Sequence, residues 1–211
     1  MTTTTTITEA TTDTTFFLSA EEGKMIAAAL DDAKKFLPSS PTGNSIENVH
    51  VVAEDGRVNI EATDRYAAIR ASIPVEAAKG TRGWLVRRDG LQVLKDMSAK
   101  HTSQVPFDGM LGLVDAWPDG SSWPNVGKFV DFDTPLDESF TREAVFNPEL
   151  FARFAVKCVG AGISSKVRKD AKAPRMTVRM NSAKSAAQVK IWHSASPVVV
   201  TGAIMPVYVK S

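Results

Sequence analysis

The chain has 211 residues, of which 43% are hydrophobic and 23% charged, a balance typical of a globular protein with a substantial core. This length fits one large domain or two small ones. The single cysteine, Cys158, excludes an intramolecular disulfide framework and a cysteine-based zinc cluster, and the three histidines lack the spacing of a zinc hydrolase. We expect no membrane span, no secretory signal and no cofactor, and therefore a cytoplasmic protein.

The first part of the chain predicts a helix followed by strands. Ten of the first fifteen residues are threonine, without apolar alternation, so we expect a disordered tail over 1–15. A capping box begins at Ser19, and an apolar stripe at helical spacing continues until Pro38 ends the helix. Further along, the patterns predict a hairpin over 49–62 around Asp55-Gly56, strands over 66–73, 84–86 and 110–114, and a second helix over 89–97.

Proline, glycine and serine crowd residues 117–135, which show no periodicity. We interpret this segment as a linker between a first domain, 16–116, and a second, reduced domain, 136–211.

The second domain predicts a strand over 140–145 and then a helix that begins at Asn147-Pro148 and continues through Cys158. Arg153 and Lys157, four residues apart, would share the polar side of this helix. Alternation over 176–180 and 189–191, and strand-rich sequence over 197–209, predict more strands. Because strands follow one another in hairpins, the sequence predicts an α+β fold of antiparallel sheets with helices packed on one face.

Charge is divided unevenly along the chain. Residues 138–211 carry a net charge of +8 and residues 1–137 a net charge of −7. This asymmetry favours a polyanionic partner for the basic half, and a solvated basic surface is the equal alternative on charge alone.

No pattern indicates catalysis. Cys158 lies on the apolar stripe of its helix, which is typical of a buried thiol. His193 and Ser194 adjoin each other, but neither a Gly-x-Ser-x-Gly turn nor a phosphate-binding glycine loop is present.

Four segments resemble, in the same order, the bacterial DNA polymerase III β sliding clamp family. They are Val58-Asn-Ile-Glu-Ala-Thr-Asp64 after an Asp-Gly turn, Trp123-Pro-Asn-Val-Gly-Lys-Phe-Val130, Val145-Phe-Asn-Pro-Glu-Leu-Phe151, and Ser196-Pro-Val-Val-Val with Ala203-Ile-Met-Pro-Val207. The resemblance implies DNA-clamp-like domains, with helices facing duplex DNA and sheets on the outside. It also implies a non-catalytic processivity factor that encircles the duplex, tethers a replicative DNA polymerase and other proteins with clamp-binding motifs, and is placed on DNA by a clamp loader.

The sequence departs from the family in length and in motif. The bacterial clamp has three domains per chain and closes as a dimer, whereas this chain has room for two, so a six-domain ring would be a homotrimer. A short clamp of this kind would suit a phage. The family has Gly-His-Arg-Leu after its Thr-Asp, where this sequence has Arg65-Tyr66-Ala67-Ala68, and Val207 stands where the family has Arg after Met-Pro. The rival hypothesis is a non-ring DNA-binding or adaptor protein of replication or recombination.

Two sets of residues are candidates for function. Basic side chains attract phosphates without reading bases, and the candidates for this contact are Lys24, Lys35, Lys95, Arg153, Lys157, Lys166, Arg168, Lys169 and Lys172. The resemblance places an apolar pocket for partner peptides at the Met-Pro segment, lined by Thr63, Tyr66, Val199, Ile204, Met205, Pro206 and Val207.

Overall fold

The computed structural model describes residues 15–40, 42–100, 104–114, 116–118, 123–130, 146–164, 166, 173–180 and 186–206. The predictions for most of the Thr-rich tail, for the strand over 140–145, and for Arg168, Lys169, Lys172 and Val207 lie outside these residues.

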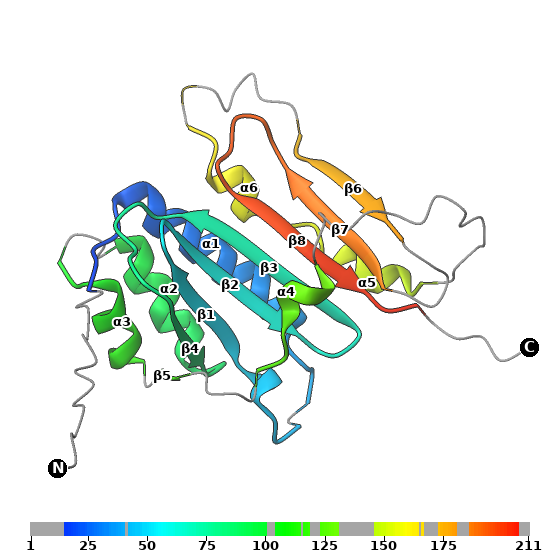
Figure 1. Ribbon diagram of the computed structural model, residues 1–211, viewed down its shortest axis with the longest axis horizontal. Coiled ribbons are helices and arrows are strands. Elements are labelled where there is room, and N and C mark those ends of the chain that lie inside the picture. The colour runs from blue at the N-terminus through cyan, green and yellow to red at the C-terminus, as the bar shows by residue number, and fades with distance from the viewer. Residues whose placement is uncertain are drawn as a thin grey trace, which may run out of the picture.

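In the described part of the chain the strands form one antiparallel sheet of eight, in the order β5-β4-β1-β2-β3-β8-β7-β6 (Figure 1). Their bounds are β1 Val49–Glu54, β2 Arg57–Thr63, β3 Ala67–Pro74, β4 Arg82–Val86, β5 Trp117–Pro118, β6 Arg175–Arg179, β7 Ala187–Trp192 and β8 Val199–Ile204. The pairing of β3 with β8 makes the sheet continuous across the two predicted domains. The division into two domains stays a prediction.

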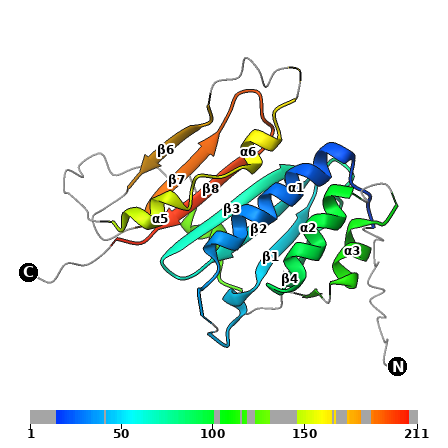
Figure 2. The same ribbon diagram turned by 180° about the vertical axis from the view of Figure 1, so that it is seen from behind.

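The longer helices cover one face of this sheet and close the main core. They are α1 Ala20–Ala33, α2 Gly90–Lys100 and α3 Phe107–Leu113, and the short helices α5 Pro148–Ala152 and α6 Cys158–Ala161 lie on the same side, beside β7 and β8 (Figure 2). The predicted α+β fold with helices packed on one face is confirmed.

Helix α1 begins where the sequence predicts. The Ser19 hydroxyl accepts a hydrogen bond from the Glu22 backbone N–H at 3.2 Å, and the Ser19 backbone N–H donates to the Glu22 carboxylate at 2.7 Å. This capping box satisfies two backbone groups that the first turn leaves unpaired. The apolar stripe of the helix, which includes Ile26 and Leu30, is buried against the sheet.

The prediction of a strand over 110–114 was wrong, because 110–113 belong to α3 and Val114 caps its end. Phe107, Met110 and Leu111 are all buried in the core. Their spacing of three and four residues is helical, and a short apolar run alone does not distinguish the two structures.

The single helix predicted from Asn147 through Cys158 is interrupted. Asn147 caps α5 as expected, with its side chain accepting from the Glu149 N–H at 2.9 Å, but α5 ends at Ala152 and α6 begins at Cys158. Between them, Phe154 turns into the core, where its ring meets that of Phe36 edge-on at 4.9 Å. A Cβ on Gly202 would clash with the Phe154 ring, so this glycine in β8 permits the close packing.

The opposite face of the sheet is crossed by the segment that follows β5. Its helix α4, Val126–Phe129, lies over β3 and β8 (Figure 1). Val126 and Val130 pack there with Ala68 and Ala203 in a small second apolar cluster.

Candidate partner-binding site

The turn between β2 and β3 is built by the side chains of the Thr-Asp motif. The Thr63 hydroxyl accepts from the Arg65 N–H at 3.1 Å and donates to the Ala67 carbonyl at 3.0 Å. One Asp64 carboxylate oxygen accepts from the N–H groups of Tyr66 and Ala67, both at 2.9 Å. Threonine and aspartate side chains are well suited to satisfy a tight turn in this way. The motif therefore fixes the backbone that presents Arg65 and Tyr66 to solvent.

A cavity of about 380 Å³ lies beside this turn. Ala68 of β3 and Ala203 of β8 are direct partners across the strand pair and leave a hollow, because their side chains are small. Around them stand the β2–β3 turn, the end of β8, the crossing segment and the loop before β1. The lining residues are Asn44, Ser45, Ile46, Thr63, Arg65, Ala67, Ala68, Pro124, Ala186, Ala203 and Met205.

The structure brings two of the predicted pocket residues, Thr63 and Met205, to this cavity. Tyr66 is exposed at the turn but is not part of the lining, and Pro206 is buried nearby without contributing to it. Ile204 points to the other face and is fully buried in the main core. Val199 lines a separate hollow with Arg70 and Gly127.

Sequence reasoning missed most of the cavity. The alternation of β8 was the available signal, because Ala203 and Met205 must share one face while Ile204 takes the other. The contributions of Pro124 and of 44–46 had no such signal, since they depend on how distant segments cross the sheet.

The crossing segment is fixed by a buried carboxylate. On the face of the sheet that α4 covers, the Glu61 carboxylate accepts from His50 Nδ1 at 2.8 Å, from Arg70 Nε at 2.5 Å and from Trp123 Nε1 at 3.0 Å. The rings of His50 and Trp123 also lie 5.0 Å apart. Trp123 directly precedes Pro124, so Glu61 holds one wall of the cavity in place.

Glu61 is ionised in this setting. Burial raises the pKa of its carboxyl, but the hydrogen bonds and positive charges of His50 and Arg70 together outweigh burial and hold the pKa below its ordinary value. Helix α4 passes so close to Arg70 that a Cβ on Gly127 would lie 2.7 Å from the Arg70 guanidinium.

On the helical face, two aspartates at the end of α1 collect several candidate DNA-binding lysines. Asp31 accepts from Lys157 at 3.1 Å and from Lys95 at 3.3 Å, and the hydrogen bond from Lys157 is the largest influence that lowers the pKa of Asp31. The buried Asp32 accepts from Lys35 Nζ at 2.8 Å. These contacts draw Lys35, Lys95 and Lys157 together but offset their positive charge.

The remaining DNA-binding candidates are dispersed. Lys24 and Lys166 are exposed. Arg153 forms an ion pair with Asp64 at the β2–β3 turn. The expectation that Arg153 and Lys157 share one helix was wrong, because Arg153 follows the end of α5 and Lys157 precedes α6.

Asp32 also binds the start of α6. Its second carboxylate oxygen accepts from the backbone N–H groups of Lys157 at 2.7 Å and Cys158 at 2.9 Å. Burial, followed by the Asp32 carboxylate, raises the pKa of the Cys158 thiol well above its ordinary value. Cys158 is therefore a protonated core thiol, as its place on the apolar stripe predicted.

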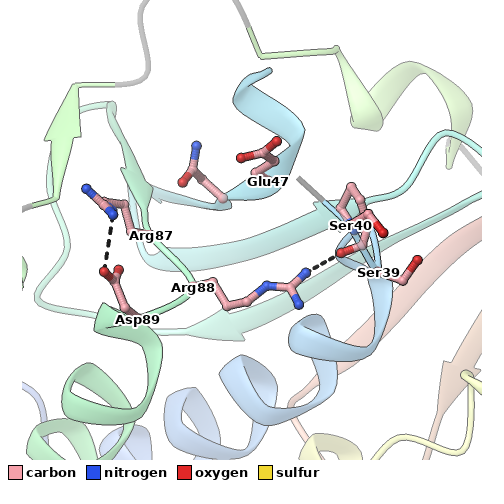
Figure 3. A pocket seen from close by; sticks show the side chains of 8 residues that line it. Ser39, Ser40, Glu47, Arg87, Arg88 and Asp89 are labelled. Atoms are coloured by element: carbon pink, nitrogen blue, oxygen red, sulfur yellow. Dashed lines mark hydrogen bonds and ion pairs between the residues drawn. The ribbon is translucent and has the colours of Figure 1, made fainter. Parts of the chain in front are cut away.

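Another hollow, of about 420 Å³, lies at the end of the helical layer, between the loop after α1 and the start of α2 (Figure 3). Arg88 donates to the Pro38 carbonyl, and Arg87 forms an ion pair with Asp89 at 3.3 Å. Glu47 also lines this hollow. The carboxylates of Glu47 and Asp89 therefore offset the positive charge of the two guanidinium groups in the lining.

Comparison with known proteins places the fold. No protein-family model matches the sequence, and no curated protein does.

Within the described residues, no helix is long and apolar enough to cross a membrane, and no three histidine, cysteine or acidic side chains gather as metal ligands would.

Solved structures of bacterial clamps match along nearly the whole chain. The DNA polymerase III β subunit of Pseudomonas aeruginosa superposes with a TM-score of 0.61 at 8% identity, over 98% of this chain and 69% of that one. The β subunit of Thermotoga maritima gives 0.58 at 8% identity, over 93% and 66%. The Helicobacter pylori β clamp bound to a DNA ligase peptide gives 0.57 at 7% identity, over 92% and 66%. The chain thus spans about two thirds of the length of these proteins, and it has the fold of the bacterial DNA polymerase III β sliding clamp.

Proposed function

We propose that the chain is a DNA sliding clamp, a non-catalytic processivity factor that encircles duplex DNA and tethers a replicative polymerase and other partners. The observation that carries this proposal is the coincidence of two features. The clamp fold extends over nearly the whole chain, and an apolar cavity lies where the Thr-Asp turn meets the Met205 segment. Those are two of the segments on which the sequence resemblance depends.

The cavity suits a short peptide. Its lining is mostly small and apolar. Met205 at its rim is 40% exposed and has a flexible, polarisable side chain. Such a hollow accepts one or two apolar side chains, which then supply most of the binding energy. A clamp of similar fold has been captured with a DNA ligase peptide, which supports a protein segment as the occupant.

Ring formation would join copies of the chain head to tail. Strand β6 ends the sheet in the described part of the chain, and the side chains of Met176 and Val178 on it are 47% and 45% exposed. An edge strand with apolar side chains is suited to pair with another copy. The basic second half and acidic first half would attract each other in that arrangement. With two domains per chain, three copies would complete six domains.

The helical layer would face the duplex, with a clamp loader opening the ring. Lys24 and Lys166 are exposed, and Lys35, Lys95 and Lys157 lie on or beside α1 and α2. A phage replisome in the cytoplasm of its host is the setting that this short clamp would suit.

A second candidate, a non-ring DNA-binding or adaptor protein, is favoured by the ion pairs. Asp31, Asp32 and Asp64 offset four of the cations that a pore would present to phosphates. This leaves a weaker electrostatic attraction for a duplex passing the helical face.

Threading on linear DNA separates the two candidates. A closed ring threads over free DNA ends, so protein added before both ends are blocked with bound streptavidin should remain on the DNA at high salt. Protein added after blocking should not. A protein that binds the side of the duplex is retained equally in both orders. Light scattering of the free protein gives the number of copies, and a monomer at micromolar concentration that shows no dependence on the order of blocking would refute the ring.

A further inference from the structure

Arg65 occupies an unusual backbone conformation at the edge of the cavity. Its φ of +79° lies in the left-handed region, and no other described non-glycine residue has a positive φ. Side chains with a Cβ rarely adopt this region, and such outliers concentrate at functional sites. The hydrogen bond from the Arg65 N–H to Thr63 holds the conformation in place.

The Arg65 side chain is the one charged group among the residues that line the cavity. It is exposed, and among the described residues no hydrogen bond or ion pair is made by its guanidinium group. The neighbouring Asp64 carboxylate is already occupied by Arg153 and by two backbone N–H groups of the turn. A guanidinium with unused donors therefore stands beside an apolar hollow.

We propose that Arg65 selects partner peptides that carry a carboxylate beside the apolar side chain held in the cavity. This inference rests on the proposed function of the cavity as a peptide site. The planar guanidinium offers two parallel donors to an aspartate or glutamate side chain, and an apolar cavity beside it strengthens the pairing by excluding water. Charge complementarity thus identifies the occupant as an acidic-apolar segment of another protein.

The test compares matched peptides on matched proteins. One peptide set carries a Leu-Phe pair with aspartate placed at each flanking position in turn, and the second set carries asparagine at the same positions. We expect the best aspartate peptide to bind the wild-type chain about tenfold more tightly than its asparagine counterpart, as measured by fluorescence anisotropy.

The Arg65→Gly variant should reduce this ratio to about one, because the aspartate peptide loses the partner of its carboxylate. Glycine adopts a positive φ readily, so the turn and the fold should persist, and thermal melting checks this. Arg82→Gln, which removes an exposed positive charge from β4, is the matched control and should keep the tenfold ratio. In Arg65→Glu, lysine in place of the aspartate should restore tight binding.

An Arg65→Gly variant that retains the full preference for aspartate would overturn the role of Arg65 while leaving the cavity as a peptide site. If neither peptide set binds the wild-type chain, the proposed peptide site itself is refuted, and the selectivity of Arg65 with it.

Discussion

The carboxylate of Asp32 in α1 accepts a hydrogen bond of 2.9 Å from the backbone N–H of Cys158, across a sequence separation of 126 residues. A helix start normally finds its cap in the residues just before it. Here the cap comes from another helix, so Asp32 ties α1 to the second half of the chain. The same carboxylate accepts from the Lys157 N–H and from Lys35 Nζ, which leaves neither oxygen without a donor.

Replacing Asp32 should therefore destabilise the whole fold. Asp32→Ala leaves the half-buried N–H of Lys157 and the buried N–H of Cys158 without an acceptor, and we expect the free energy of unfolding to fall by about 3 kcal/mol. Denaturant titration measures this loss. Asp31→Ala is the matched control one residue away, because Asp31 makes only surface ion pairs and should cost less than about 1 kcal/mol. Equal losses in the two variants would show that Asp32 does not join the halves.

Asp31 provides a charge test of the helical face. Asp31→Asn keeps the shape of the side chain but releases Lys95 and Lys157 from a carboxylate partner. If this face meets the duplex, DNA affinity should rise and its dependence on salt should steepen, because more counterions are displaced. Lys157→Glu should have the opposite effect. Filter binding over a range of salt concentrations gives both quantities, and unchanged slopes in both variants would move the DNA contact away from α1.

Loss of the Glu61 carboxylate should loosen the cavity wall. In Glu61→Gln the amide presents one acceptor oxygen to three donors, from His50, Arg70 and Trp123, and we expect a stability loss of about 2 kcal/mol. Peptide affinity should fall because Pro124 is no longer held. Glu76→Gln, at an exposed position, serves as the control. Acrylamide quenching of tryptophan fluorescence should increase in the Glu61 variant only.

The same carboxylate predicts a dependence on pH. Because the pKa of Glu61 is lower in the folded protein than in the unfolded chain, the unfolded chain takes up its proton first as the pH falls. The stabilisation is complete above the ordinary glutamate value of about 4.3 and is lost as the pH falls through the lower folded value. The free energy of unfolding should thus decline less steeply below that pH in Glu61→Gln than in wild type. Identical slopes in urea titrations at matched pH would contradict this assignment.

Two methionines should separate partner binding from assembly. Met205→Lys places a charge at the cavity rim and should abolish peptide binding and polymerase stimulation while leaving the number of copies unchanged. Met176→Lys places the same charge on the β6 edge and should weaken self-association without affecting peptide binding. Light scattering and anisotropy on both variants provide the comparison. Partner binding by a folded Met205→Lys protein would move the site elsewhere.

Local patterns of the sequence predicted most elements but not the interruptions between them. The capping box at Ser19 and the Asp55-Gly56 turn depend only on neighbouring residues, so the sequence was sufficient to predict them. The structure confirms both. The break after Ala152 could not be read locally, because it arises from the distant contacts of Phe154 with Phe36 and Gly202.

The candidate site was only partly predictable for the same reason. Glu61 alternates with buried residues of β2, a pattern that predicts a solvent-facing charge. It is instead covered by Trp123, which lies 62 residues further along the chain. Met205 and Thr63 were identified through the resemblance, whereas Arg65 stands where the family motif has glycine and was therefore noted only as a departure.

The pairing of Ala68 with Ala203 has a consequence for synthesis of the protein. The floor of the cavity needs β3 and β8 side by side, and β8 leaves the ribosome long after β3. A nascent chain that has completed α1 through β4 still lacks half of the floor, so on the proposal that the cavity is a peptide site such a chain would not yet bind a partner. On that proposal, competence to bind partners would arrive together with closure of the sheet, and unfinished chains would not compete with the mature protein.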